Sequence, residues 1–163
     1  LLLRHGPAEP RTGDKPDSER ALTKDGLKRT RAAAAGLAML IDRPNLILTS
    51  PKRRARETAE IAGKAMKRTP ETWDILADAD AEELRDALRQ REPTGALMLV
   101  GHEPTFSELT ELLCFGAVHA TIELKKAGCA HIEIDDQTHF GESATLKALL
   151  PPRALRALGK SKS

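Results

Sequence analysis

Three short apolar runs, each followed at once by polar residues, constrain the fold of this chain more than any other feature. They are residues 1–3 before Arg4-His5-Gly6, residues 45–49 before Ser50-Pro51, and residues 96–100 before Gly101-His102. Apolar runs of this length, bounded by turn residues, predict buried strands. Helical patterns separate them along the chain, and alternating strands and helices predict an α/β fold with a mostly parallel sheet.

The remaining segments complete this prediction. Helices are expected from the N-cap Thr23 to residue 41, from Ser50-Pro51 to residue 66, over 81–89, and from Pro104 onward. Further strands are expected at 73–76, 120–124, 129–134 and 144–149, and a loop at 6–21. We therefore predict one three-layer α/β/α domain over residues 1–152, with antiparallel strands at an edge of the sheet. Residues 153–163 are expected to be a basic tail that is partly helical and frays.

The composition excludes several classes of protein. The chain has 26 Lys and Arg against 24 Asp and Glu, and only four aromatic residues, none of them Tyr. This balance lacks the basic footprint of a nucleic-acid binder and the aromatic platform that stacks bases. The longest apolar run, residues 32–41, is too short to span a membrane.

The cellular compartment is predicted from the cysteines and from the first residues of the chain. The chain begins Leu1-Leu2-Leu3-Arg4 without a secretory apolar region, and without a Met, so a few N-terminal residues are expected to be missing. Cys114 and Cys129 do not make a disulfide framework and have no partner at metal-ligand spacing. We expect a monomer in the reducing cytoplasm, with no membrane or nucleic-acid partner.

Polar side chains that follow parallel strands meet at one edge of a sheet, where α/β proteins bind their ligands. Arg4, His5, Arg54 and His102 are expected to converge there. Two guanidinium groups and two imidazoles suit an anion, and arginine suits phosphate in particular. The residues alone therefore predict a phosphate pocket with a histidine as candidate nucleophile.

Arg54 is chosen from a run of basic residues by its helical position. It shares a stripe with Thr58 on the inner side of the predicted helix. Lys52, Arg53 and Arg56 are expected to form a solvated face.

Four sequence blocks resemble the histidine phosphatase superfamily, whose fold is like that of phosphoglycerate mutase. They are Arg4-His5-Gly6, Leu22-Thr23-Lys24-Asp25-Gly26, Ser50-Pro51-Lys52-Arg53-Arg54-Ala55-Arg56-Glu57-Thr58, and Gly101-His102-Glu103-Pro104. They occur in the family's order and extend across the chain. The short length and the block around Arg20 are similar to the SixA-type phosphohistidine phosphatases.

The resemblance implies roles for the matched residues. His5 would be the nucleophile that forms a phosphohistidine intermediate, and Arg4, Arg54 and His102 would hold the phosphoryl oxygens. Neighbouring cations would keep His5 neutral, and no metal or other cofactor would be needed. Arg20 is expected either to bind substrate or to form a simple salt bridge in its loop.

The sequence departs from larger family members at the general acid. No position among Asp78, Asp80, Glu82 and Glu83 matches it, and these residues are expected to form the capped, acidic start of a helix. Without an acid, a labile P–N bond is the favoured target, so a protein that carries phosphohistidine is the expected substrate.

Other interpretations stand beside this one. His5, His102 and Arg54 could each be structural, and His119, His131 and His139 are interpreted as structural or exposed. The alternative functions are a small-molecule phosphomonoesterase of the same superfamily and a phosphate- or phosphoprotein-binding module without turnover.

Overall fold

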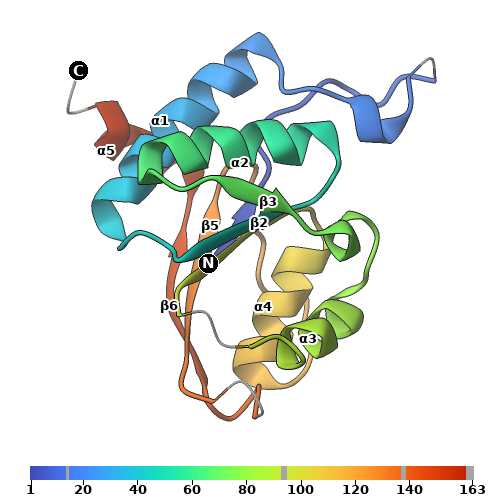
Figure 1. The fold of residues 1–163 in the computed structure, drawn as a ribbon, viewed down its shortest axis with the longest axis vertical. Helices are drawn as coiled ribbons and strands as arrows, with labels where there is room; N and C mark the ends of the chain where they lie inside the picture. The colour runs from blue at the N-terminus through green and yellow to red at the C-terminus, as the bar shows by residue number, and fades with distance from the viewer. Residues whose placement is uncertain (14, 93–94, 137–138, 161–163) are drawn as a thin grey trace.

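The computed structural model describes residues 1–13, 15–92, 95–136 and 139–160. Within them, six strands form one sheet in the order β3-β2-β4-β1-β5-β6 (Figure 1). The strands are β1 (Leu2–Arg4), β2 (Leu46–Thr49), β3 (Pro70–Thr72), β4 (Leu97–Gly101), β5 (Cys129–Ile134) and β6 (Ala144–Leu150). The first four run parallel, and β5 and β6 are antiparallel additions beside β1. The predicted mostly parallel sheet with antiparallel edge strands is confirmed.

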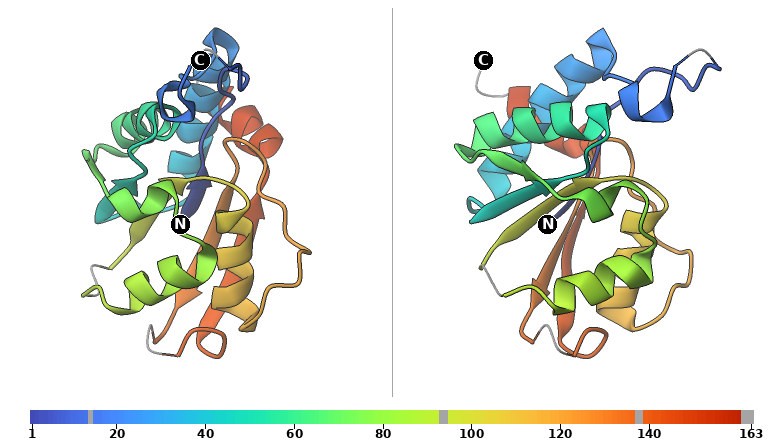
Figure 2. Two further views of the ribbon diagram at one scale, coloured as in Figure 1. Left: turned by 90° about the vertical axis from the view of Figure 1, so that its right-hand side faces the viewer. Right: turned by 45° about the vertical axis from the view of Figure 1, so that its right-hand side comes forward.

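Helices cover both faces of this sheet (Figures 1 and 2). One face carries α1 (Lys24–Leu40), α2 (Arg53–Met66) and α5 (Pro152–Lys160), and the other carries α3 (Ala81–Arg89) and α4 (Thr105–Phe115). Two short 3-10 helices, η1 (Asp17–Glu19) and η2 (Asp74–Ala77), lie in the connections. A separate apolar core fills each side of the sheet, so the predicted three-layer α/β/α architecture is confirmed.

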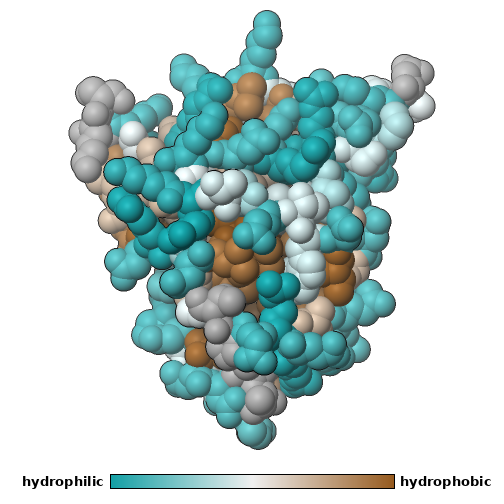
Figure 3. All heavy atoms as spheres, in the orientation of Figure 1, coloured by the Kyte–Doolittle hydropathy of each residue, from teal (hydrophilic) through white to brown (hydrophobic). Residues whose placement is uncertain are grey.

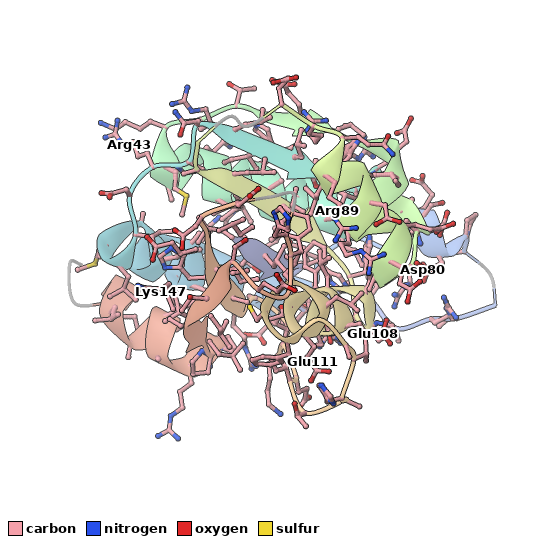
Figure 4. All side chains as sticks on the ribbon, turned by 90° about the horizontal axis from the view of Figure 1, so that it is seen from below. Arg43, Asp80, Arg89, Glu108, Glu111 and Lys147 are labelled. Carbon is pink, nitrogen blue, oxygen red and sulfur yellow. The ribbon has the colours of Figure 1, made fainter. Side chains whose placement is uncertain are left out.

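Helix starts follow local chemistry. Thr23 caps α1 as predicted, because its hydroxyl accepts a hydrogen bond from the Gly26 amide at 2.9 Å. Asp80, labelled in Figure 4 at the start of α3, forms a reciprocal capping box with Glu83. The start of α2 differs from the prediction: it begins at Arg53, so Ser50 is not its N-cap.

The prediction of a strand at 120–124 is wrong, because backbone amides that would pair with a neighbouring strand donate to a buried carboxylate instead. Glu111 on α4 is 1% exposed and accepts hydrogen bonds from the amides of residues 119–122 (Figure 4). Ala120 also has a left-handed φ of 55°, which interrupts an extended strand. Burial would raise the pKa of Glu111, but these hydrogen bonds lower it to about 2.

The edge strand predicted at 73–76 is also wrong in position. The strand is β3, three residues earlier, and it pairs in parallel with β2 from Pro70 to Thr72. Asp74–Ala77 forms η2 instead, and Leu76 is buried in the core beside α3.

The C-terminal segment differs from the expected frayed tail between Pro152 and Lys160. There α5 packs against α1, and Leu155 is fully buried in the core. Gly36 on α1 and Gly159 on α5 permit this close approach, because a Cβ on either would meet backbone oxygen at about 2 Å. Residues 161–163 of the predicted tail lie outside the described residues.

The two edges of the sheet differ in chemistry. At the amino ends of β1 and β4, an apolar hollow of about 320 Å³ is lined by Leu1, Leu97, Leu113 and Ile132 among others. Figure 3 shows brown apolar atoms gathered in the middle of the face seen in Figure 1. No helix in the described ranges is long and apolar enough to cross a membrane. The polar residues of the sequence motifs lie at the opposite, carboxyl edge.

Candidate active site

Two histidines meet at the carboxyl edge because their strands are neighbours. β1 and β4 pair in parallel with Arg4 opposite Gly101, so the next residues, His5 and His102, emerge side by side. The His5 amide donates to the Gly101 carbonyl at 3.0 Å, which fixes the chain where it leaves β1. The two ring centroids are 5.2 Å apart with the planes tilted by 56°.

The hydrogen bonds of His5 define the proton on its ring. Nδ1 lies 2.8 Å from the Gly6 carbonyl, which can only accept, so Nδ1 carries the hydrogen. Nε2 accepts a hydrogen bond from Arg54 Nε at 3.2 Å, so it presents a lone pair. Burial lowers the pKa of His5 to about 3, with smaller contributions from Arg54, Arg4 and Lys126. His5 is therefore a neutral imidazole at physiological pH.

Thr58 locks the segment after His5 onto α2. Its buried hydroxyl accepts from the Gly6 amide at 3.0 Å and donates to the Arg54 carbonyl one turn earlier at 2.7 Å. The shared stripe of Arg54 and Thr58 in the sequence thus ties the first motif to the third. Because Thr58 holds both Gly6 and the Arg54 backbone, it sets the spacing between the two side chains that meet at His5 Nε2.

Ser50 is a site residue whose role the sequence did not indicate. It follows β2, is fully buried, and shares a hydrogen bond of 2.8 Å with His102 Nε2. Burial, with the nearby His5, Arg54 and Lys52, lowers the pKa of His102 to about 3. Within the described residues, His102 Nδ1 is buried with no hydrogen-bond partner, so its hydrogen-bonding capacity is unused in this structure.

Arg54 is buried at the start of α2 and is held by Asp17 in η1. The Arg54 guanidinium donates to the Asp17 backbone carbonyl at 2.7 Å and to its carboxylate at 3.0 Å. Burial would raise the pKa of Asp17, but Arg54, Arg11 and Arg20 together lower it to about 2. The Arg54 guanidinium, which was predicted to bind phosphate, is therefore already bound to the negatively charged carboxylate of Asp17. Nothing in the sequence pattern indicated this role for Asp17.

Arg20 and Arg4 each bind a backbone carbonyl near the site. Arg20 forms a salt bridge with Asp17 at 2.9 Å and donates to the Glu9 carbonyl at 2.7 Å, while its role in substrate binding stays a prediction. Arg4 donates to the Leu124 carbonyl at 2.6 Å, while its Nε is buried without a partner in the described part of the chain. The structure thus brings His5, Arg54 and His102 together, with Arg4 next to His5 in the chain and Arg20 joined to Arg54 through Asp17.

A pocket of about 260 Å³ opens beside these residues. Arg54, His102, Lys52, Glu103, Asp17 and Arg11 supply its polar lining. The prediction that Lys52 belongs to a solvated face is wrong. Its ammonium turns inward to donate to the Ala77 carbonyl and to Asp78, both at 2.7 Å. Arg53 and Arg56 are exposed, as predicted.

Of the four acidic residues considered from the sequence, Asp78 lines the pocket, and Glu103 is a further carboxyl group in its lining that was not considered. Asp80 and Glu83 cap α3, and Glu82 lies in its first turn, as predicted, whereas Asp78 is outside that turn and pairs with Lys52. Glu103, next to His102, is half-buried and accepts from the Ser107 hydroxyl at 2.5 Å. Burial raises its pKa, so Glu103 retains a proton more readily than an exposed glutamate. Among the described residues, no group of three or more His, Cys, Asp or Glu could hold a metal ion.

The fold and this site define a class: a three-layer α/β protein that presents neutral histidines and a buried arginine at the carboxyl edge of its sheet. The sequence model of the histidine phosphatase superfamily (branch 1) matches residues 1–95. The chain belongs to this superfamily and is a phosphatase. An uncharacterized protein from Picosynechococcus sp. is 38% identical over 131 residues, which are 78% of this chain and 79% of that protein.

Solved structures agree with this placement. A structure assigned as the phosphohistidine phosphatase SixA of Agrobacterium tumefaciens is 26% identical, with a TM-score of 0.78 over 93% of this chain and 96% of that one. The protein histidine phosphatase SixA in complex with tungstate has the same fold, with a TM-score of 0.80, 23% identity, and 94% and 97% of the two chains covered. A phosphoserine phosphatase from Entamoeba histolytica is more distant, at 14% identity and a TM-score of 0.66 over 94% and 97%.

Proposed function

We propose that this phosphatase removes phosphoryl groups from phosphohistidine on proteins, through a covalent intermediate on His5. The observation that carries the proposal is the state of His5. Its ring is neutral, and Nε2 presents a lone pair to the Arg54 guanidinium, where a bound phosphoryl group would lie. A neutral imidazole is a nucleophile, whereas a protonated one is not.

In the proposed first step, the Nε2 lone pair attacks phosphorus. A new P–N bond forms, and the bond to the substrate imidazole breaks with its electron pair passing to that ring. The substrate ring carries a proton on its other nitrogen, so it leaves as neutral imidazole. His5 gains positive charge, which the Nδ1 hydrogen bond to the Gly6 carbonyl stabilises. Water then attacks phosphorus, the bond to Nε2 breaks, and inorganic phosphate leaves the neutral His5 behind.

Positive groups around the phosphoryl oxygens would supply the electrostatic stabilisation. Arg54 would exchange its Asp17 carboxylate for phosphoryl oxygen, Arg4 would add positive charge next to His5, and His102 would donate from the nitrogen that has no partner in the described residues. Phosphoryl transfer depends mainly on such positioning and charge compensation. On this proposal, no metal ion takes part.

The test is to replace His5 by Ala. We expect loss of turnover of a phosphohistidine protein by more than a thousandfold, with tungstate binding retained, because Arg54 and His102 remain. His131→Ala, a partly buried histidine on β5, is the matched control. Rapid quenching of the wild-type protein with radiolabelled substrate should give labelled protein that is stable to base and labile to acid. Retention of a tenth of the activity in His5→Ala would overturn the mechanism.

Glu103 favours a second candidate, a phosphomonoesterase for small molecules. An alkoxide leaving group needs a proton, and Glu103 lines the pocket with a raised pKa. If this candidate holds, Glu103→Gln will reduce turnover of an alkyl phosphate at least a hundredfold. If the phosphohistidine proposal holds, the variant will turn over phosphohistidine nearly as fast as the wild type, with Glu108→Gln as control. A side-by-side assay of phosphohistidine protein and sugar phosphates then decides between the two substrates.

A further inference from the structure

A second, larger groove of about 680 Å³ lies behind Arg4, outside the pocket of Arg54 and His102. Three segments distant in sequence build it: α1, the loop before β5, and the start of α5, which lie next to one another in the left view of Figure 2. Its cationic lining is Arg4, Arg29, Lys125, Lys126, Arg153 and Arg156.

The charge of this groove departs sharply from that of the whole chain. The described residues that line it include six of the chain's 26 Lys and Arg residues but only one of its 24 Asp and Glu residues, Glu123. Arg29 pairs with Asp25, and Lys125 pairs with Glu123. Within the described ranges, Lys126, Arg153 and Arg156 have no salt-bridge partner. A concentration of unpaired cations in a concave surface attracts anions.

The start of α5 adds an independent observation. A helix N-terminus carries partial positive charge and is stabilised by acidic residues, but the first turn of α5 contains none and holds Arg153. Arg156 follows one turn later. Arginines at a helix N-terminus lower the stability of the helix, and residues that oppose local stability in this way occur at ligand-binding sites. An anion bound in the groove would offset the repulsion between these arginines and the helix N-terminus.

The groove borders the segment that carries the nucleophile. Arg4, which precedes His5 in the chain, lines it, and so does Lys126, whose charge contributes to the lowered pKa of His5. A ligand in the groove would therefore lie next to the end of β1 that presents His5. No aromatic residue is present among its lining, so the groove offers no surface on which nucleic-acid bases could stack.

We propose that this basic groove binds an acidic segment of the phosphoprotein substrate, rich in Asp and Glu and adjoining the phosphorylated residue. The inference rests on the proposed function and adds to it a determinant of substrate choice. Cations spread over three chain segments fit several carboxylates along a peptide better than one compact phosphate. The groove would increase the affinity for the substrate and leave the chemistry at His5 unchanged.

The test is the double variant Arg153→Ala/Arg156→Ala, with Arg43→Ala/Lys64→Ala as a control of equal charge change on exposed residues elsewhere (Arg43 is labelled in Figure 4). For a phosphohistidine peptide with acidic flanks we expect kcat/KM to fall about tenfold through KM. Turnover of p-nitrophenyl phosphate, and of a phosphohistidine peptide with neutral flanks, should not change. If the double variant fails to fold, Lys125→Ala, which lies outside α5, replaces it in the test. This variant should lower kcat/KM for the peptide with acidic flanks about threefold.

Equilibrium binding of an unphosphorylated, fluorescent acidic peptide separates this proposal from the proposed function. It should weaken about tenfold in the double variant even if no phosphohistidine is turned over. Unchanged affinity for the acidic peptide, or an equal loss on p-nitrophenyl phosphate, would overturn the inference. Tighter binding of a short RNA than of the acidic peptide would also overturn it and identify nucleic acid as the ligand.

Discussion

Replacing Asp17 by Asn should strengthen the binding of phosphate and of tungstate, because Asp17 competes with them for Arg54. Burial opposes its charge, yet the surrounding arginines lower the pKa of Asp17 from 3.8 to about 2, which corresponds to roughly 2 kcal/mol in total. This stabilisation of the Asp17 charge comes from three arginines together, and a quarter of the side chain is exposed, so water screens part of it. The contact with Arg54 is therefore worth roughly 1 kcal/mol, and its loss should tighten binding about fivefold.

Isothermal titration of tungstate into the wild type and Asp17→Asn measures this difference. Glu19→Gln, in the same short helix, removes an equal charge without a contact to Arg54 and should leave the affinity nearly unchanged. Since the carboxylate of Asp17 stays charged above its folded-state pKa of about 2, the ratio of the two affinities should be constant between pH 5 and 8. Weaker binding in Asp17→Asn would refute the reasoning, because Asp17 would then position Arg54 for the ligand.

The remaining predictions concern stability and cofactors. Glu111→Gln should lower the free energy of unfolding by about 3 kcal/mol in urea, with the exposed Glu60→Gln as control, since Gln keeps one acceptor oxygen and its NH₂ group would face backbone amides that now donate to the second carboxylate oxygen. Because the folded-state pKa of Glu111 is depressed from 4.5 to about 2, wild-type stability should be full above pH 4.5 and fall towards pH 2, and Glu111→Gln should lack this component. Gly36→Ala should lower the melting temperature, since its Cβ would lie 1.9 Å from the Leu155 carbonyl oxygen, whereas Gly13→Ala meets nothing within 4 Å. Phosphatase activity should survive EDTA, and a loss that added divalent metal restores would contradict the proposed mechanism.

The parts of the fold that the sequence predicted are those governed by local rules. Apolar runs bounded by turn residues located β1, β2 and β4, and the N-cap Thr23 located the start of α1. Because parallel strands end at one edge, the convergence of His5 and His102 also followed from the pattern. The predictions that were wrong involve long-range polar contacts. Glu111 withdraws residues 119–122 from strand pairing, and Lys52 turns inward to a carbonyl 25 residues away in the chain.

In the site, too, the residues selected by local sequence pattern were predicted, and those that depend on long-range contacts were not. Arg54 could be selected by helical periodicity, since its stripe had to face the core. Asp17, Ser50 and Glu103 could not, because their importance arises only from proximity to Arg54, His102 and the pocket. Acidic residues were sought between the third and fourth blocks, where the resemblance to larger family members implies a general acid, whereas the half-buried carboxyl group of Glu103 follows His102 directly.

The position of β1 in the middle of the sheet has a consequence for how the enzyme is made. Its partners are β4 and β5, so the segment that presents His5 pairs only with chain that follows about 95 to 130 residues later. During translation, the strand that presents the nucleophile lacks both of its partner strands until Gly101 and then Cys129 have left the ribosome. Such distant pairing slows folding, because loops must close before contacts form. Nascent chains released between residues 104 and 128 should therefore be inactive even though they already contain every residue of the proposed site.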